Sequence, residues 1–161
     1  MRMETLVAEM KRGYLATLAM FDNVLKTCTV EVWEKDFPGA PFWREAYHTI
    51  FWMHNYLGRK EKEFKFHPFG PDIDPRLWVP PNNTCTREEV RSFSARTREY
   101  IDEVFDRMTL EELAGPDDYN ESRFRCVFHR LMYGLRHVQH HIGKLAGYLD
   151  AEGLDVDHWA G

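Results

Sequence analysis

Apolar residues recur at steps of three and four along most of this chain, the spacing that gives an α-helix one apolar face. In the first such segment they are Val7, Met10, Tyr14, Leu18, Phe21 and Leu25. In the last they are Phe124, Phe128, Leu131, Leu135, Val138, Ile142 and Leu145. The sequence has no segment with the polar–apolar alternation typical of a strand. The periodicity therefore predicts an all-α fold.

Start and stop signals divide the periodic sequence into long helices. These are predicted over residues 4–28, 42–57, 86–108 and 120–149. Pro41 suits the beginning of the second helix and Gly58 its end. Thr86-Arg87-Glu88-Glu89 matches a capping box at the start of the third helix. Thr109-Leu110-Glu111-Glu112 repeats that pattern and predicts one short extra turn.

A long connection rich in proline, residues 59–85, joins the second and third helices. Loops of this length are uncommon inside a compact domain. A crossover along a four-helix bundle accounts for it and makes the second and third helices parallel. Its apolar residues predict that it packs over the bundle: Phe64, Phe66, Phe69, Ile73, Leu77, Trp78 and Val79. Either Phe66, Phe69 and Trp78 wall a substrate pocket, or the loop seals one end of the bundle.

Length and charge narrow the class of protein. A chain of 161 residues predicts a single domain over residues 1–161. The net charge of −5, with basic residues scattered among acids, argues against nucleic acid or an anionic membrane as partner. The chain has neither an apolar run of the ~18 residues needed to span a bilayer nor an apolar leader. Cys28, Cys85 and Cys126 lack CxxC spacing, which predicts reduced thiols in a cytoplasmic protein.

Three histidines stand close together near the end of the last predicted helix: His137, His140 and His141. Residues advance by ~100° around a helix, so His137 and His141 project from one face, as two ligands of one metal ion must. His140 lies on another side and is expected to face solvent. A pair four residues apart also occurs on solvated helix faces, so the pair alone does not establish a metal site.

A third ligand has to come from another helix, because zinc and similar ions usually take at least three protein ligands. The second helix offers His48 and His54, which are six residues apart and point in different directions. His54 falls near the apolar arc of its helix and could be a core histidine. His48 points away from that arc, and geometry favours it only slightly.

Other residues of the last helix have more than one interpretation. Gly134, one turn before His137, could leave room for a metal, a ligand or a close neighbouring helix. Arg130 could bind an anionic substrate group, although a surface arginine whose alkyl stem packs on the helix is the simpler interpretation. Cys126 is expected to be a packing residue.

The end of the last helix resembles a known pattern. His137-x-x-x-His141-Ile142-Gly143-Lys144-Leu145 is similar to the HxxxH-[RI]-G-[QK]-L pattern of the DinB-like family. Trp43-Arg44-Glu45-Ala46-Tyr47-His48 resembles the stretch that carries the helix-two ligand of that family, which favours His48 over His54. The resemblance follows the helix order over nearly the whole chain. Ile142-Gly143-Lys144 replaces the usual Arg-Gly-Gln, which leaves the ligands in place but removes any contact made by that arginine.

The resemblance implies a four-helix bundle with up-down-down-up topology and a divalent metal ion, Zn, Ni, Fe or Mn, on His48, His137 and His141. It also implies a metal-dependent enzyme, either a transferase that uses a low-molecular-weight thiol or a hydrolase acting on a small molecule. The alternatives are a non-catalytic metal-binding or stress-response bundle and a metal-free dimer-forming bundle. The first two helices carry apolar surface beyond a single stripe, which is compatible with a homodimer.

Overall fold

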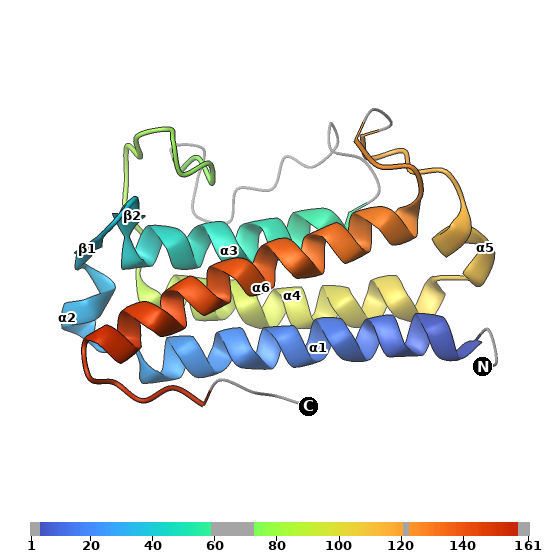
Figure 1. Cartoon of the computed structure of the whole chain (residues 1–161). Coiled ribbons are helices and arrows are strands. Elements are labelled where there is room, and N and C mark those ends of the chain that lie inside the picture. Colours follow the sequence, from blue (N-terminus) through green and yellow to red (C-terminus); the bar gives the residue numbers. More distant parts are fainter. Residues whose placement is uncertain (1–3, 59–72, 121–122, 158–161) are drawn as a thin grey trace.

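Four long helices dominate the computed structural model, which describes residues 4–58, 73–120 and 123–157 (Figure 1). They are α1 (Glu4–Thr27), α3 (Phe42–Leu57), α4 (Arg87–Arg107) and α6 (Val127–Ala151). The shorter elements are α2 (Val30–Trp33), β1 (Asp36–Phe37), β2 (Ala40–Pro41) and α5 (Leu110–Ala114). The predicted all-α class is confirmed. None of the described helices is long and apolar enough to cross a membrane.

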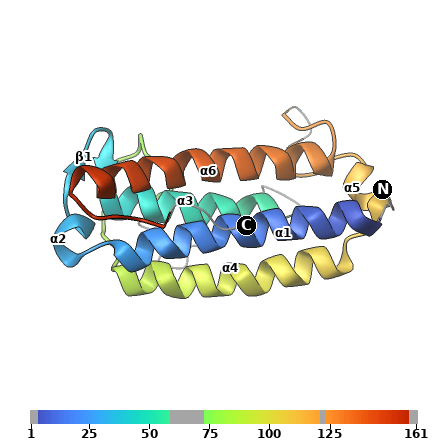
Figure 2. The ribbon, with the colours of Figure 1, turned by 60° about the horizontal axis from the view of Figure 1, so that its bottom comes forward.

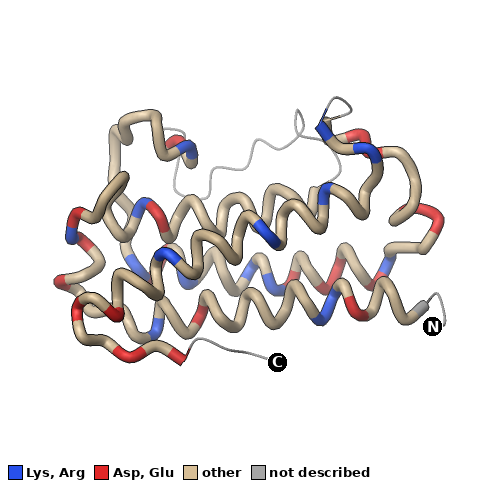
Figure 3. The backbone as a smooth tube through the Cα atoms, in the orientation of Figure 1, with Lys and Arg blue, Asp and Glu red and all other residues tan. Residues whose placement is uncertain are grey.

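The long helices lie side by side (Figures 1 and 2), and the main cluster of buried apolar side chains lies between them. Helix α3 packs against α6 and α4, and α1 packs against the same two helices. In Figure 1, α3 and α4 run from the left end to the right, whereas α1 and α6 run from right to left. Core side chains from all four are fully buried, among them Tyr14, Leu18, Phe21, Ile50, Phe93, Leu131 and Val138. Acidic and basic residues are interspersed along the helices (Figure 3).

Two capping boxes begin helices where the sequence predicts them. The Thr86 hydroxyl accepts from the backbone of Glu89, whose carboxylate accepts in return from the Thr86 backbone. Thr109 and Glu112 make the same reciprocal pair at the start of α5. Each cap contributes about 1 kcal/mol to helix stability. The predicted third helix and the extra turn are both confirmed.

The last helix begins at Val127, so the predicted start at Asn120 is wrong. The Asn120 carbonyl accepts from the backbone amides of Arg123 and Phe124, which makes an isolated turn. Cys126 then has an extended backbone and caps α6. Phe124 is buried, but in a small cluster with Tyr56 and Tyr119 outside the main core. It continues the apolar spacing without belonging to the helix.

The short strands β1 and β2, which the sequence does not predict, form an antiparallel pair before α3. Gly39 in the turn between them has a φ of 102°. That backbone conformation is easily adopted by glycine and strained for most other residues. The pair and α2 link α1 to α3 at one end of the bundle (Figure 1).

The described end of the crossover, residues 73–85, packs on α3. Ile73 is buried, and the buried Arg44 of α3 donates to the carbonyls of Arg76, at 2.8 Å, and of Val79. Trp78 is 76% exposed, so it does not pack over the bundle as predicted. Phe64, Phe66 and Phe69 lie outside the described residues.

Gly134 accommodates close neighbouring helices, one of the three interpretations that the sequence leaves open. A Cβ at this position would lie 2.9 Å from Tyr14 Oη on α1 and 2.9 Å from Tyr56 Cβ on α3. Contacts that short require one of the neighbours to shift. Gly134 therefore controls how closely α6 approaches α3, the helix that carries His48.

We expect Gly134→Ala to lower the free energy of unfolding by about 1–3 kcal/mol, because the overpacking outweighs the better helix propensity of alanine. Chemical denaturation measures the change. Gly147→Ala is the matched control, because a Cβ at Gly147 of α6 meets nothing within 4 Å. That variant should gain up to about 1 kcal/mol. Equal effects of the two substitutions would contradict the close-packing role.

Candidate metal centre

His48, His137 and His141 come together between α3 and α6, each offering one ring nitrogen within 4.8 Å of the other two. His48 Nε2 lies 3.2 Å from His137 Nε2 and 3.1 Å from His141 Nε2. His137 and His141 stand one turn apart on α6, so the spacing of four residues places them on one face. The structure thus brings together the three predicted ligands.

Two of these rings have their other nitrogen occupied. His48 Nδ1 lies 2.7 Å from the carbonyl oxygen of Pro75, and a carbonyl can only accept, so Nδ1 carries the hydrogen. His141 Nδ1 lies 2.5 Å from Glu45 Oε1, a carboxylate oxygen that likewise accepts. Nε2 is therefore the nitrogen that each of these rings offers to a metal ion. The two Nε2 atoms lie 3.1 Å apart, a spacing at which one cation can bind both.

Burial favours the neutral form of two of the rings, His48 and His137. It lowers the pKa of His48 to about 4, with the nearby charge of His141 adding to the effect. Burial also lowers the pKa of His137 to about 3, aided by His141, His48 and Arg123. Neutral imidazole is the form that binds a metal ion. These two ligands are therefore ready to bind a metal at neutral pH without first losing a proton.

The nitrogen spacing fits a single small divalent ion. With metal–nitrogen distances of about 2.05–2.1 Å, neighbouring ligands lie about 3.4 Å apart in a tetrahedron and about 2.9 Å apart at the right angles of an octahedron. The observed 3.1 and 3.2 Å fall between these values. Within residues 4–58, 73–120 and 123–157, the cluster contains these three histidines and no acid or cysteine.

Glu45 contacts the Nδ1 side of the His141 ring, and Lys144 contacts Glu45. Glu45 is 1% exposed, and its Oε1 also lies 2.7 Å from Lys144 Nζ. Burial by itself would raise the pKa of Glu45, but hydrogen bonds from His141 and Lys144, with their charges, outweigh it and hold the pKa at about 2. The carboxylate is therefore ionised at neutral pH.

The centre approaches solvent on the side of His137, which is half-buried whereas His48 and His141 are buried. Three aromatic rings surround His137: Trp52, Tyr56 and Tyr133. Arg123 donates to the Tyr133 hydroxyl and lies 4.4 Å from the centroid of that ring. Arg136 lies 5.4 Å from the same centroid. This side of the site combines aromatic surface with positive charge.

His54 of α3 and His140 of α6 are not part of this cluster. His54 faces α4, where its Nδ1 lies 3.1 Å from Thr97 Oγ1 and its ring stacks on Tyr100. It is the core histidine that the sequence offered as an alternative. His140 is exposed, as predicted from its position around the helix.

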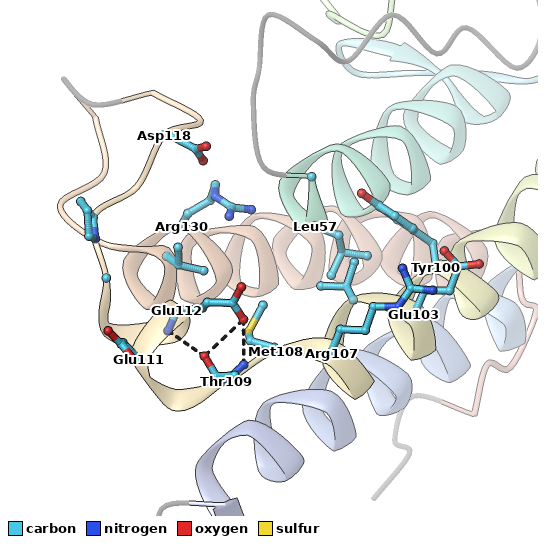
Figure 4. A pocket seen from close by; sticks show the side chains of 15 residues that line it. Leu57, Tyr100, Glu103, Arg107, Met108, Thr109, Glu111, Glu112, Asp118 and Arg130 are labelled. Carbon is cyan, nitrogen blue, oxygen red and sulfur yellow. Dashed lines mark hydrogen bonds between the residues drawn. The ribbon is translucent and has the colours of Figure 1, made fainter.

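Arg130 is neither a surface residue nor a free anion-binding group. It is 1% exposed and donates to Asp117 Oδ2 at 2.7 Å and to the Tyr56 carbonyl. It borders a cavity of about 950 Å³ between the ends of α3 and α4, α5 and the start of α6 (Figure 4). None of the three clustered histidines lines this cavity. Cys126 caps α6 and is half-buried, and all three cysteines are free.

Sequence reasoning missed the supporting residues Glu45, Lys144 and Pro75. Glu45 precedes His48 by three residues and Lys144 follows His141 by three, so each shares a helix face with a ligand. An acid at that spacing from a candidate ligand is a signal that could have identified Glu45. The Pro75 carbonyl has no sequence signal, because backbone oxygens occur at every residue.

We expect the metal-free protein to lose stability as the pH falls from about 6.5 to about 4. Burial lowers the pKa of His54 to about 4, as it does for His48, from an ordinary value of 6.5. In this window the unfolded chain binds more protons than the folded one, so acid favours unfolding, and the full stability is present above pH 6.5. Denaturation at several pH values measures the slope.

The His54→Phe variant is the control for this pH dependence. It removes one of the protons taken up on unfolding and leaves His48, His137 and His141 in place. Its stability should therefore vary less steeply with pH than that of the wild type. Identical slopes would show that His54 is not held neutral by burial.

Comparisons with protein-family models, with curated proteins and with solved structures find no match for this chain, so the resemblance to the DinB-like family stays a prediction.

Proposed function

We propose that this chain is a metal-dependent enzyme of the DinB-like type, with one divalent ion held by His48, His137 and His141. The observation that carries the proposal is the convergence of three histidine rings, in which His48 Nε2 lies 3.1 Å from His141 Nε2 and 3.2 Å from His137 Nε2. The Nδ1 atoms of His48 and His141 contact Pro75 and Glu45, so each of these rings directs its Nε2 atom toward the centre. The chain directions in Figure 1 support the up-down-down-up topology of that family.

A divalent ion held by three imidazoles supplies Lewis-acid chemistry, toward water or toward a thiol. The residues around the centre favour a thiol-dependent transferase over a hydrolase. Hydrolysis needs a group that passes a proton to the leaving group, and Glu45, the carboxylate beside the cluster, is committed to His141 and Lys144. A thiol that binds a cation would lose its proton to solvent at neutral pH, because the cation stabilises the thiolate form, so its activation needs no base from the protein.

The exposed side of the site supports a substrate or thiol that carries carboxylate groups. Arg123 and Arg136 lie beside Tyr133, whose ring stacks next to His137. Guanidinium groups pair with carboxylates in charge-assisted hydrogen bonds. A low-molecular-weight thiol with carboxylates would place its sulfur toward the histidines and its charges toward these arginines.

Metal content tests the first part of the proposal. Elemental analysis of the purified protein should find about one divalent ion per chain in the wild type and in His140→Ala, and none in His141→Ala. His140 is the matched control because it is exposed and adjacent to His141. Equal metal content in all three proteins would overturn the assignment.

Activity tests the second part. Metal-free and metal-reconstituted protein are assayed for transfer of low-molecular-weight thiols to electrophilic acceptors and for hydrolysis of ester and amide substrates. We expect thiol transfer that appears only after reconstitution and is weakened by Arg123→Ala through a higher KM for carboxylate-bearing thiols. Hydrolysis without thiol transfer would favour the hydrolase. Stoichiometric metal without turnover would indicate a non-catalytic metal-binding protein.

A further inference from the structure

A single oxygen of Glu45 receives two donors from α6. His141 Nδ1 lies 2.5 Å and Lys144 Nζ 2.7 Å from Oε1. Because His141 and Lys144 are three residues apart on α6, they reach the same point on α3. A buried histidine, carboxylate and lysine therefore form one chain of contacts that begins at a proposed metal ligand and ends at a half-buried cation.

Burying Glu45 is costly unless its charge has partners, because a carboxylate removed from water loses its hydration. An ion pair with Lys144 alone could be made at the surface, where the side chain of Lys144 is 31% exposed. Glu45 is instead 1% exposed and lies behind the His141 ring. Burial of the carboxylate therefore brings it into contact with His141, which a surface ion pair with Lys144 would not do.

We propose that Glu45 is a positioning residue, which orients the His141 ring so that its Nε2 atom points toward the metal. Lys144 partly neutralises the carboxylate and so weakens its electrostatic effect on the ring. The inference rests on the proposed metal centre. A carboxylate that accepts from a metal-bound imidazole fixes the ring and strengthens it as a ligand. A cation on the same oxygen opposes that effect.

Metal affinity provides the first test. In zinc titrations with a competing chelator, Glu45→Gln should bind zinc about 10–100 times more weakly than the wild type, because the amide oxygen still accepts but carries no charge. Lys144→Met keeps the length of the side chain and removes its charge. It should bind zinc up to about fivefold more tightly, the range of a half-exposed ion pair.

The tautomers of the histidine rings in the metal-free protein provide a second test. A carboxylate with only a structural role would not determine which nitrogen of His141 carries the hydrogen. In ¹⁵N NMR spectra we expect His141 to carry its hydrogen on Nδ1 in the wild type and to lose that preference in Glu45→Leu. His48 is the internal control, because its Nδ1 donates to Pro75 and should not change. If Glu45→Leu fails to fold, the affinity of Glu45→Gln still tests the proposal.

The outcomes separate this inference from the proposed function. If wild-type protein binds no zinc, the metal centre is wrong, whatever the tautomers are. If the wild type binds zinc and Glu45→Gln binds it equally well, the positioning role is wrong while the centre stands. Weaker zinc binding by Lys144→Met would overturn the part assigned to Lys144.

Discussion

Saturating zinc is expected to raise the free energy of unfolding of the metal-free protein by about 3–4 kcal/mol, when free zinc stands at 100 to 1,000 times its dissociation constant. The folded chain offers three converging nitrogens, whereas the unfolded chain holds His48 and His141 far apart. A ligand that binds only the folded state stabilises it by mass action. For a domain of this size the melting temperature should rise by about 6–16 °C. Thermal unfolding with and without zinc measures the shift.

The stabilisation should vanish in His48→Ala, which retains the pair on α6 but lacks the ligand from α3. His140→Ala should respond to zinc as the wild type does, because His140 is exposed and outside the cluster. An equal shift in His48→Ala would mean that zinc binds elsewhere. The absence of a shift in the wild type would contradict the metal centre itself.

Replacing Asp117 by alanine is expected to lower the free energy of unfolding by about 3–5 kcal/mol, the cost of leaving a buried charge without its partner. Asp117 is 4% and Arg130 1% exposed, and they lie 2.7 Å apart. Asp117 Oδ1 also accepts from the backbone amides of Tyr119 and Asn120, which shapes the turn before α6. Denaturant unfolding measures the loss.

Two controls test whether the expected loss of stability comes from the burial of the ion pair rather than from the loss of any ion pair. Glu9→Ala breaks an ion pair with Arg12 whose side chains are 50% and 73% exposed, and should cost less than about 1 kcal/mol. The double variant Asp117→Leu with Arg130→Met removes both buried charges and should be more stable than Asp117→Ala alone. A double variant as unstable as Asp117→Ala would show that the backbone contacts of Asp117 dominate.

The helices are predictable from the sequence because their signals are local. Apolar spacing and the Thr86 and Thr109 capping boxes act within a few residues, and the structure places helix starts directly after both threonines. The start of α6 is not predictable in this way, because Phe124 has helical spacing but packs with Tyr56 and Tyr119. The packing of Phe124 depends on Tyr56, which is distant in the sequence.

The site is predictable in part for the same reason. The spacing of His137 and His141 identifies a shared face without any tertiary information. The choice between His48 and His54 depends on which neighbour lies on each side of α3. In the structure His48 faces α6 and His54 faces Thr97 of α4. The family resemblance favoured His48, whereas helix geometry alone barely distinguished the two.

The hydrogen bond from His48 to Pro75 couples the centre to the end of the crossover. Arg44, one turn earlier on α3, holds the carbonyls of Arg76 and Val79 in the same segment. Any equilibrium that moves residues 73–79 therefore also changes how His48 is oriented. Thermodynamic linkage between two binding sites is reciprocal. A molecule that binds and orders this segment would raise the affinity for the metal by some factor, and the bound metal would raise the affinity for that molecule by the same factor.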